Sequence, residues 1–132
     1  MTLSYAIRLG AMMLPHSDNY LEGTSGPLGP PTSCCALGGA ALAAGFERQR
    51  DVYIERFLDR HWGAVLALRV PHPVRGDIVA VRTAIHGLNN TRCYHWTRER
   101  IAGWIATIEP REREEVPCAT TKPATAAEIG RL

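Results

Sequence analysis

The sequence predicts a single, mostly α-helical domain of about five helices, with a small α+β fold as the alternative. Apolar residues recur three and four positions apart in several segments, which is the spacing of one buried helical face. The chain has 132 residues, of which 45% are hydrophobic and 21% charged, as is typical of one globular domain. A domain of this size can bury enough surface to fold without a metal or a disulfide. We expect residues 1–110 to form it.

The first helix is expected over residues 2–14, where apolar residues follow helical spacing until Pro15 ends the pattern. Residues 15–33 are rich in glycine and proline and predict a long loop. A loop of this length in a compact domain either carries function or serves as a flexible connection, and the sequence leaves both alternatives open.

A central, buried helix is expected over residues 34–45. Its side chains are almost all Ala, Gly, Leu or Cys, and such small side chains allow neighbouring helices to approach closely. Thr32 or Ser33 would cap its beginning, and Gly45 would end it.

Residues 47–68 predict one long helix or two shorter ones. Acidic residues recur every four positions between arginines, and a solvated face of alternating charge explains them better than a metal or catalytic site. Residues 70–74 should be extended, because each residue before a proline is pushed out of the helical region. Residues 76–88 fit a helix, although residues 78–81 alone would also fit a strand.

The last helix is expected to begin after Thr97, a plausible N-cap, and to end at Pro110. Trp96 and Ile101 occupy the two positions of a hydrophobic staple. Four apolar residues then follow the spacing of one buried face: Ile101, Trp104, Ile105 and Ile108. Residues 111–132 combine a charged run with Pro, Thr and Ala and predict a loosely held C-terminal tail, in which a short helix from Thr125 is possible.

Charge and hydropathy argue against several classes of function. The net charge of +2 is too small for a strong electrostatic grip on nucleic acid or anionic lipid. The longest apolar run, residues 34–46, is too short to span a bilayer. The N-terminus lacks the pattern of a signal peptide, so we expect a cytoplasmic protein with reduced cysteines.

Cys35 and His86 form a candidate catalytic pair. A thiol at a helix N-terminus has a lowered pKa, and His86 lies 51 positions after Cys35. With the Gly-Asp-hydrophobic run at residues 76–81, this spacing faintly resembles papain-like thiol hydrolases of the NlpC/P60 type. Their nucleophile motif differs from Ser33-Cys34-Cys35, and a packed, inert cysteine is the commoner state of a thiol among Ala and Leu. The hydrolase is therefore an alternative reading, and no catalytic residue is assigned in the preferred one.

Histidines and cysteines supply enough soft ligands for zinc: His61, His72, Cys93, His95 and Cys118. Zinc sites usually show paired ligand spacing, and Cys93 with His95 is the single close pair. No metal or cofactor is expected.

Aromatic and basic residues gather just before the last helix, and we predict a binding surface there: Arg92, Tyr94, His95, Trp96 and Arg98. Tyr, Trp and Arg are the usual anchors of protein interfaces. A small DNA-binding regulator is a further alternative, because arginines at a helix N-terminus can contact phosphate. The low charge and the length of the connection disfavour it, so nucleic acid is not the expected partner.

Four segments resemble small uncharacterised proteins of phages and prophages: residues 6–12, 35–41, 86–90 and 96–104. The last, Trp-Thr-Arg-Glu-Arg-Ile-Ala-Gly-Trp, is the most specific. Asn90 stands where that pattern has Asp, and Val70-Pro-His-Pro stands where some relatives carry a pair of cysteines. The resemblance implies a phage setting but no reaction. Combined with the small size and modest charge, it predicts a non-enzymatic accessory protein that binds a host or phage protein, for example as an anti-CRISPR-like inhibitor of host defence. The oligomeric state is not predicted.

Overall fold

The computed structural model describes residues 1–23 and 29–110. These residues form five α-helices, which are α1 (Leu3–Met13), α2 (Ala36–Ala43), α3 (Ile54–Ala67), α4 (Val81–Asn89) and α5 (Arg98–Ile108). Two antiparallel hairpins accompany them, made by β1 (Leu21–Glu22) with β2 (Ser33–Cys34) and by β3 (Arg69–Pro71) with β4 (Ile78–Ala80). The predicted mostly helical domain of about five helices is confirmed, and the two hairpins also fit the α+β alternative. Within the described ranges, no helix has the length and apolar character needed to cross a bilayer.

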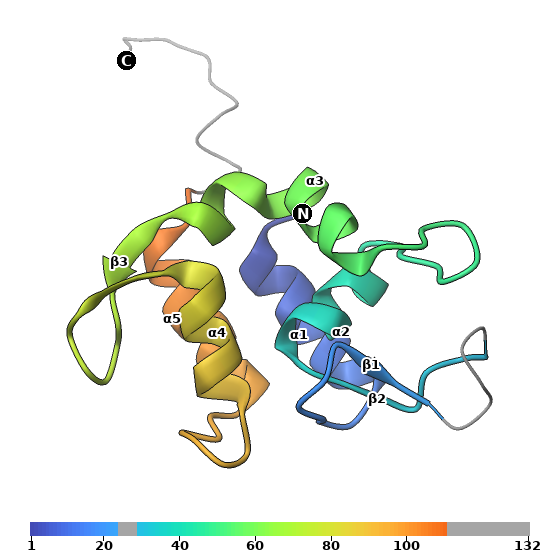
Figure 1. The fold of residues 1–132 in the computed structure, drawn as a ribbon, viewed down its shortest axis with the longest axis horizontal. Helices are drawn as coiled ribbons and strands as arrows, with labels where there is room; N and C mark the ends of the chain where they lie inside the picture. The colour runs from blue at the N-terminus through green and yellow to red at the C-terminus, as the bar shows by residue number, and fades with distance from the viewer. Residues whose placement is uncertain (24–28, 111–132) are drawn as a thin grey trace, which may run out of the picture.

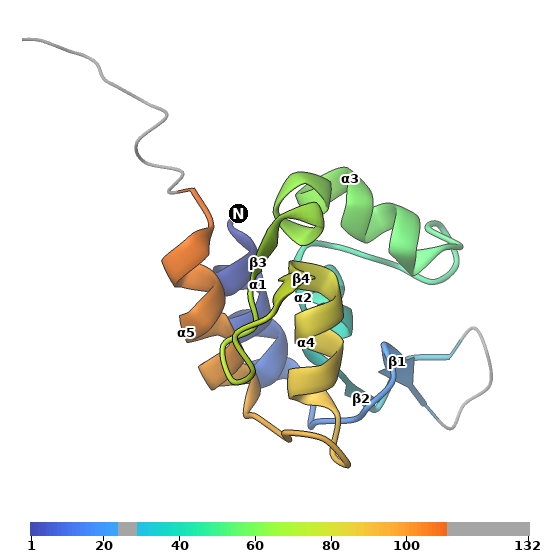
Figure 2. The same cartoon turned by 60° about the vertical axis from the view of Figure 1, so that its left-hand side comes forward.

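Helices α1 and α2 lie together at the centre of the domain (Figure 1). Helix α5 packs along α1, α4 lies beside α5, and α3 crosses one end of the bundle (Figures 1 and 2). One hydrophobic core joins all five helices. Its largest fully buried side chains include Leu3, Ile7, Leu37, Leu58, Ile85, Leu88, Ile101 and Ile105.

Helix α2 is the central buried helix that the sequence predicts, with residues 36–41 all buried. A Cβ atom built on Gly10 of α1 would lie 2.3 Å from the carbonyl carbon of Gly39 on α2. Real carbon atoms cannot approach so closely, so the two helices meet through bare backbone. Gly45, with φ of 102°, ends the helical segment as expected.

The beginning of α2 differs from the prediction. Ser33 and Cys34 belong to β2, and the cap is Cys35 rather than Thr32 or Ser33. The Cys35 Sγ atom accepts a hydrogen bond from the backbone N–H of Gly38 at 3.4 Å. Pairing of β2 with β1 keeps the chain extended to Cys34, so helical geometry begins two residues later than the composition suggests.

The prediction of one irregular loop over residues 15–33 is also corrected. Residues 21–22 pair with residues 33–34, and His16 forms an isolated bridge with Cys34. Backbone bonds from Ser17 to Cys34 (2.9 Å) and from Cys35 to Asn19 (2.9 Å) fasten the segment to the beginning of α2. The tip of the loop, residues 24–28, lies outside the described residues.

Helix α3 begins at Ile54, seven residues after the expected start at Glu47, because the preceding residues form turns. It consists of two helical pieces across a kink at Trp62 (φ −139°, ψ 24°), so both alternatives offered by the sequence are partly right. The Trp62 indole N–H donates to the carbonyl oxygen of Met1 at 3.1 Å. Glu47, Asp51 and Asp59 form ion pairs with arginines, and Glu55 accepts a hydrogen bond from the Tyr20 hydroxyl. These contacts fit a structural role for this charged face.

Residues 76–88 contain both the strand and the helix that the sequence allowed as alternatives. Ile78–Ala80 is a strand, and the helix begins only at Val81, so the prediction of a continuous helix was wrong for the first residues. Val79 pairs with Val70 on β3. This pairing joins two segments, and the spacing of apolar residues within one segment cannot predict it. The expected extended conformation holds over Val70 and Pro71.

Helix α5 follows the prediction closely. Thr97 Oγ1 accepts from the Arg100 N–H at 3.1 Å, and Ile101 and Ile105 are fully buried. Glu109, just after α5, accepts hydrogen bonds from the N–H groups of Leu3 (3.0 Å) and Ser4 (3.1 Å). A residue that is distant in the sequence therefore caps the beginning of α1. The predicted tail, with its possible helix from Thr125, lies outside the described residues.

His72 closes the hairpin between β3 and β4. Its ring is buried, and Nδ1 accepts hydrogen bonds from the N–H groups of Val74 and Arg75, both at 3.1 Å. The proton of the neutral ring must therefore sit on Nε2. Burial, aided by the charge of Arg75, lowers the pKa of His72 below its ordinary value.

We expect His72 to make the fold sensitive to mild acid. Because its folded pKa lies below the unfolded one, its contribution to stability is complete above about pH 6.5 and is lost as the pH falls toward the lowered pKa. His72→Asn retains an acceptor at the position of Nδ1 but does not titrate, so the difference in unfolding free energy between wild type and variant should shift against the wild type from pH 7 to pH 5. His72→Ala should cost about 1–3 kcal/mol at pH 7 through its two orphaned N–H groups. Urea unfolding measures both, and a difference between wild type and His72→Asn that is independent of pH would contradict the assignment.

Candidate functional site

The connection between α4 and α5 has a fixed shape. The carbonyl oxygen of Asn90 accepts from the N–H groups of Cys93 and His95, both at 3.0 Å, and its Oδ1 accepts from the Arg92 N–H at 2.8 Å. At its end, the Trp96 N–H donates to the carbonyl oxygen of Leu88 at 2.7 Å. These bonds build a compact turn that holds the predicted binding residues in place.

A second segment supports this turn from outside. Asp18 Oδ1 accepts from both the backbone N–H and the hydroxyl of Thr91, each at 2.9 Å. These two hydrogen bonds hold the pKa of Asp18 below its usual value. The His16 ring donates from Nε2 to the carbonyl oxygen of Asn89 at 2.9 Å. The segment after α1 and the connection before α5 therefore form one unit.

His95 has a φ of 48°, and it is the one described non-glycine residue with a positive φ. Histidine adopts this conformation less easily than glycine or asparagine, so the backbone is mildly strained here. The strained turn brings the His95 ring to 5.1 Å from the ring of His16, between centroids. Strain of this kind is common at functional sites, where the surrounding bonds hold it.

The two histidines open onto a pocket of about 360 Å³ between the end of α1 and the beginning of α5. Its lining consists of Ala11, His16, His95, Trp96, Thr97, Arg98 and Glu99. Of the five predicted binding residues, the structure brings three to this pocket: His95, Trp96 and Arg98. Arg92 is exposed elsewhere on the connection, and Tyr94 turns the other way, with its ring 5.3 Å from that of His72.

The charged groups of this pocket are already partly engaged. Arg98 Nη1 lies 3.5 Å from both the carbonyl oxygen and the Sγ atom of Cys34. Glu99 forms an ion pair with Arg8 of α1 at 2.7 Å. The guanidinium of Arg100, which is not among the lining residues, stacks over the Trp96 ring at 3.9 Å from its centroid.

Sequence reasoning missed His16. It follows Pro15 in a segment whose composition indicates only a loop, and nothing local marks its proximity to His95. The signal lies in the tertiary pairing of His16 with Cys34 and Asn89, which periodicity and motif spacing do not carry.

The structure does not join Cys35 to His86 through a described hydrogen bond. Cys35 is 3% exposed, and burial raises the pKa of its thiol even though it caps a helix. His86 Nε2 lies 3.3 Å from the hydroxyl of Tyr20, which donates to Glu55 at 3.2 Å. The burial of Cys34 raises the pKa of that thiol as well. Both thiols therefore belong to the core contacts of α2.

We expect the rate at which each thiol is alkylated to follow its exposure to solvent. In the native protein, iodoacetamide should modify the exposed Cys93 at least about tenfold faster than Cys34 or Cys35, because buried thiols with raised pKa values hold little thiolate. Peptide mass spectrometry of a Cys118→Ser background measures each rate. Preferential labelling of Cys35 would instead support the thiol hydrolase.

No group of three or more His, Cys, Asp or Glu within residues 1–23 and 29–110 is arranged to hold a metal ion. The candidate ligands are dispersed. His61 stacks on Phe57 at 4.2 Å, His72 closes its hairpin, and His95 faces His16. Cys118 lies outside the described residues.

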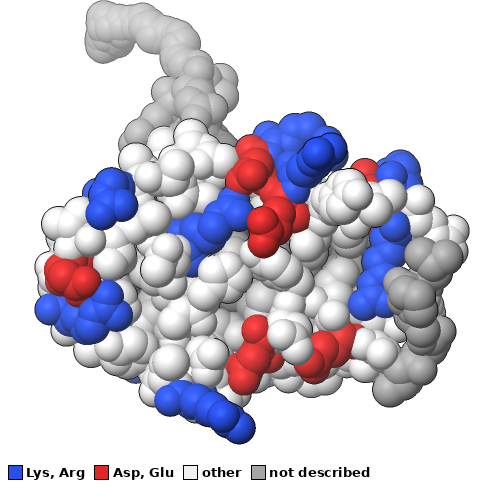
Figure 3. Space-filling view, viewed as in Figure 1, with Lys and Arg blue, Asp and Glu red and all other residues white. Residues whose placement is uncertain are grey.

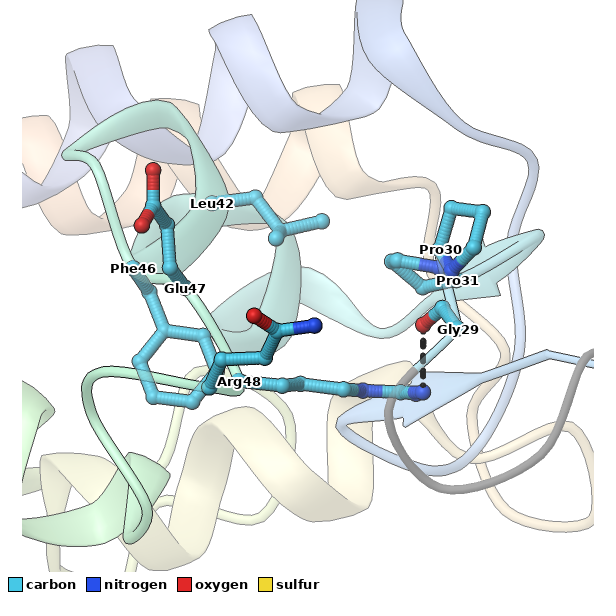
Figure 4. Close-up of a pocket in the computed structure, with 8 residues that line it drawn as sticks. Gly29, Pro30, Pro31, Leu42, Phe46, Glu47 and Arg48 are labelled. Atoms are coloured by element: carbon cyan, nitrogen blue, oxygen red, sulfur yellow. Dashed lines mark hydrogen bonds between the residues drawn. The ribbon is translucent and has the colours of Figure 1, made fainter.

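Another pocket, of about 310 Å³, lies between Pro30–Pro31 and the connection from α2 to α3 (Figure 4). Arg48 Nη1 donates across it to the carbonyl oxygen of Gly29 at 2.9 Å, and Leu42 and Phe46 form its apolar side. None of the predicted binding residues lines this pocket, so the candidate site is placed at the histidine pocket instead.

Positive and negative side chains are interspersed on the face shown in Figure 3, and neither sign covers a broad area of it. This distribution matches the small net charge of +2. Proteins that bind nucleic acid through its backbone usually present a contiguous basic surface.

No protein-family model, curated protein or solved structure matches the chain. The resemblance of its four segments to phage and prophage proteins therefore stays a prediction.

Proposed function

We propose that this protein acts without catalysis, by binding another protein through the α4–α5 connection and the adjoining histidine pocket. The observation that carries the proposal is a strained, hydrogen-bonded turn that presents imidazole, indole and guanidinium groups around one hollow. A preformed surface of this kind loses little conformational entropy on binding, and Trp and Arg are common interface anchors.

Two further observations support a binding role over the alternatives. The thiols on which a hydrolase would depend are buried, with raised pKa values. The modest charge and its interspersed distribution disfavour a DNA-binding regulator. From the resemblance of its segments to phage and prophage proteins, we propose that the protein acts in the cytoplasm of a phage-infected or lysogenic bacterium. It would be an accessory protein that binds a host or phage protein, and a host defence complex is one candidate.

Affinity capture with matched variants tests the proposal. The tagged wild type should recover a partner in fixed stoichiometry from host lysate. The double variant His95→Asn/Arg98→Gln should recover at least about tenfold less, because interface anchors commonly contribute 2 kcal/mol or more. Arg69→Gln, an exposed change on β3, should recover as much as the wild type. A partner that all three baits retain equally, or the recovery of none, would overturn the proposal, and binding of duplex DNA with a steep salt dependence would favour the regulator.

A further inference from the structure

We infer that the histidine pocket receives a carboxylate side chain, a Glu or Asp of the bound protein. This inference rests on the proposed function, because it names the chemistry by which the partner would be recognised. It depends on three features of the pocket, namely its charge, its size and its apolar wall.

The charge of the pocket favours a single negative group. Arg98 lines it, and the Arg100 cation stacks on its Trp96 wall. The lining carboxylate, Glu99, is already paired with Arg8 at 2.7 Å. Asp18, at 3.7 Å from His16 Nε2, is engaged by Thr91. An added carboxylate therefore meets Arg98, the one guanidinium that lines the pocket, while the nearby carboxylates are engaged by other groups.

The same groups disfavour a phosphate. A phosphate monoester carries a charge of about −1.5 to −2 near neutral pH, and strong phosphate sites gather several cations. Here one guanidinium lines the pocket together with the carboxylate of Glu99, and Asp18 lies 3.7 Å from the His16 ring. One negative charge is the better match to this balance.

Size and shape indicate a side chain rather than a cofactor. A volume of about 360 Å³ is at the lower end for small-molecule sites. The Trp96 ring offers an apolar surface to the methylene groups of an acidic side chain, and Arg98 and His95 line the same pocket as candidate donors to its oxygen atoms. The His16 Nε2–H is already bound to the Asn89 carbonyl oxygen and is not available to the carboxylate.

A peptide pair tests the inference without any partner protein. Acetyl-Gly-Glu-Gly-amide, titrated into the ¹⁵N-labelled full chain, should shift the Arg98 side-chain and His95 signals saturably, in the millimolar range expected of one side chain. The isosteric Gln peptide should not.

Matched variants locate the effect. Arg98→Gln should weaken binding of the Glu peptide at least about fivefold, whereas Arg69→Gln, an exposed change on β3 outside the pocket lining, should leave it unchanged. His95→Asn should fold, since asparagine tolerates a φ of 48°, and should weaken binding of the Glu peptide by removing an imidazole that lines the pocket.

Equal responses to the Glu and Gln peptides, or equal losses from Arg69→Gln and Arg98→Gln, would overturn the inference. So would tighter binding of inorganic phosphate than of the Glu peptide. The two proposals fail separately. A captured partner with no response to the peptide would leave the binding function standing, and peptide binding without a captured partner would leave the pocket chemistry standing.

Discussion

Gly10→Ala is expected to lower the free energy of unfolding by about 3–5 kcal/mol, at the severe end for a single methyl group. The new Cβ would lie 2.3 Å from the carbonyl carbon of Gly39 and 2.4 Å from its carbonyl oxygen. Both obstacles are backbone atoms of a buried helix, so no side chain can rotate away. Helices α1 and α2 would have to separate, and the core that both helices share would open with them.

Gly87→Ala provides the matched control. Gly87 is also a helical glycine, on α4, but a Cβ there would meet nothing within 4 Å. Alanine favours the helix by up to about 1 kcal/mol, so this variant should be as stable as the wild type or more stable. Urea unfolding followed by circular dichroism compares the two. Similar midpoints for Gly10→Ala and Gly87→Ala would show that close backbone contact does not hold α1 against α2.

Local signals predicted the helices well. Periodic apolar residues located α1 and α5, small side chains identified α2 as the buried centre, and Thr97 was correctly assigned as a cap. Several of the errors have one physical origin. The β1–β2 and β3–β4 hairpins depend on pairing between segments, and each takes residues away from an adjacent predicted helix or loop. Periodicity within one segment cannot register a hydrogen bond to another.

The segments that resemble phage proteins have structural duties in this chain. Gly10 and Gly39 allow the close contact of α1 with α2, Cys35 caps α2, and Thr97 caps α5. Asn90, which stands where the pattern has Asp, uses its Oδ1 to accept from Arg92, and a carboxylate oxygen could fill the same place. These residues therefore have structural roles in the domain, and none of these roles points to a reaction.

Sequence reasoning singled out only one of the two segments that form the candidate site. Aromatic and basic residues before α5 directed the prediction to this connection, because Trp, Tyr and Arg are common interface anchors. The opposite side of the pocket is lined by His16, which lies 3.7 Å from Asp18. Both residues come from a segment whose composition indicates only a loop. Tyr94 was grouped with His95 by proximity in sequence, and the turn at His95 sends the two rings to different sides.

Asn89→Ala should be the second most damaging substitution, at about 2–4 kcal/mol of unfolding free energy, because it orphans two buried backbone groups. Asn89 is 3% exposed. Its Oδ1 accepts from the N–H of Ala36 at the beginning of α2, and its Nδ2 donates to the carbonyl oxygen of Ser17, both at 3.1 Å. One side chain thus ties α4 to α2 and to the segment that carries His16.

Asn89→Asp separates the hydrogen bonds from simple packing. The substitution preserves shape but replaces the donor to Ser17 with a buried carboxylate oxygen that faces a carbonyl. Burial of that charge should raise the pKa of the introduced carboxyl, so the lost stability should return as the pH falls and the protonated acid regains a donor. Asn90→Ala, which removes one acceptor at a more exposed position, should cost less than about 1 kcal/mol. Urea midpoints from pH 4.5 to pH 7.5 measure all three variants. Two results would contradict this role of the Asn89 hydrogen bonds in joining α4 to α2 and to the segment that carries His16. One is an equal loss of unfolding free energy from Asn89→Ala and Asn90→Ala, and the other is an Asn89→Asp variant that is most stable at neutral pH.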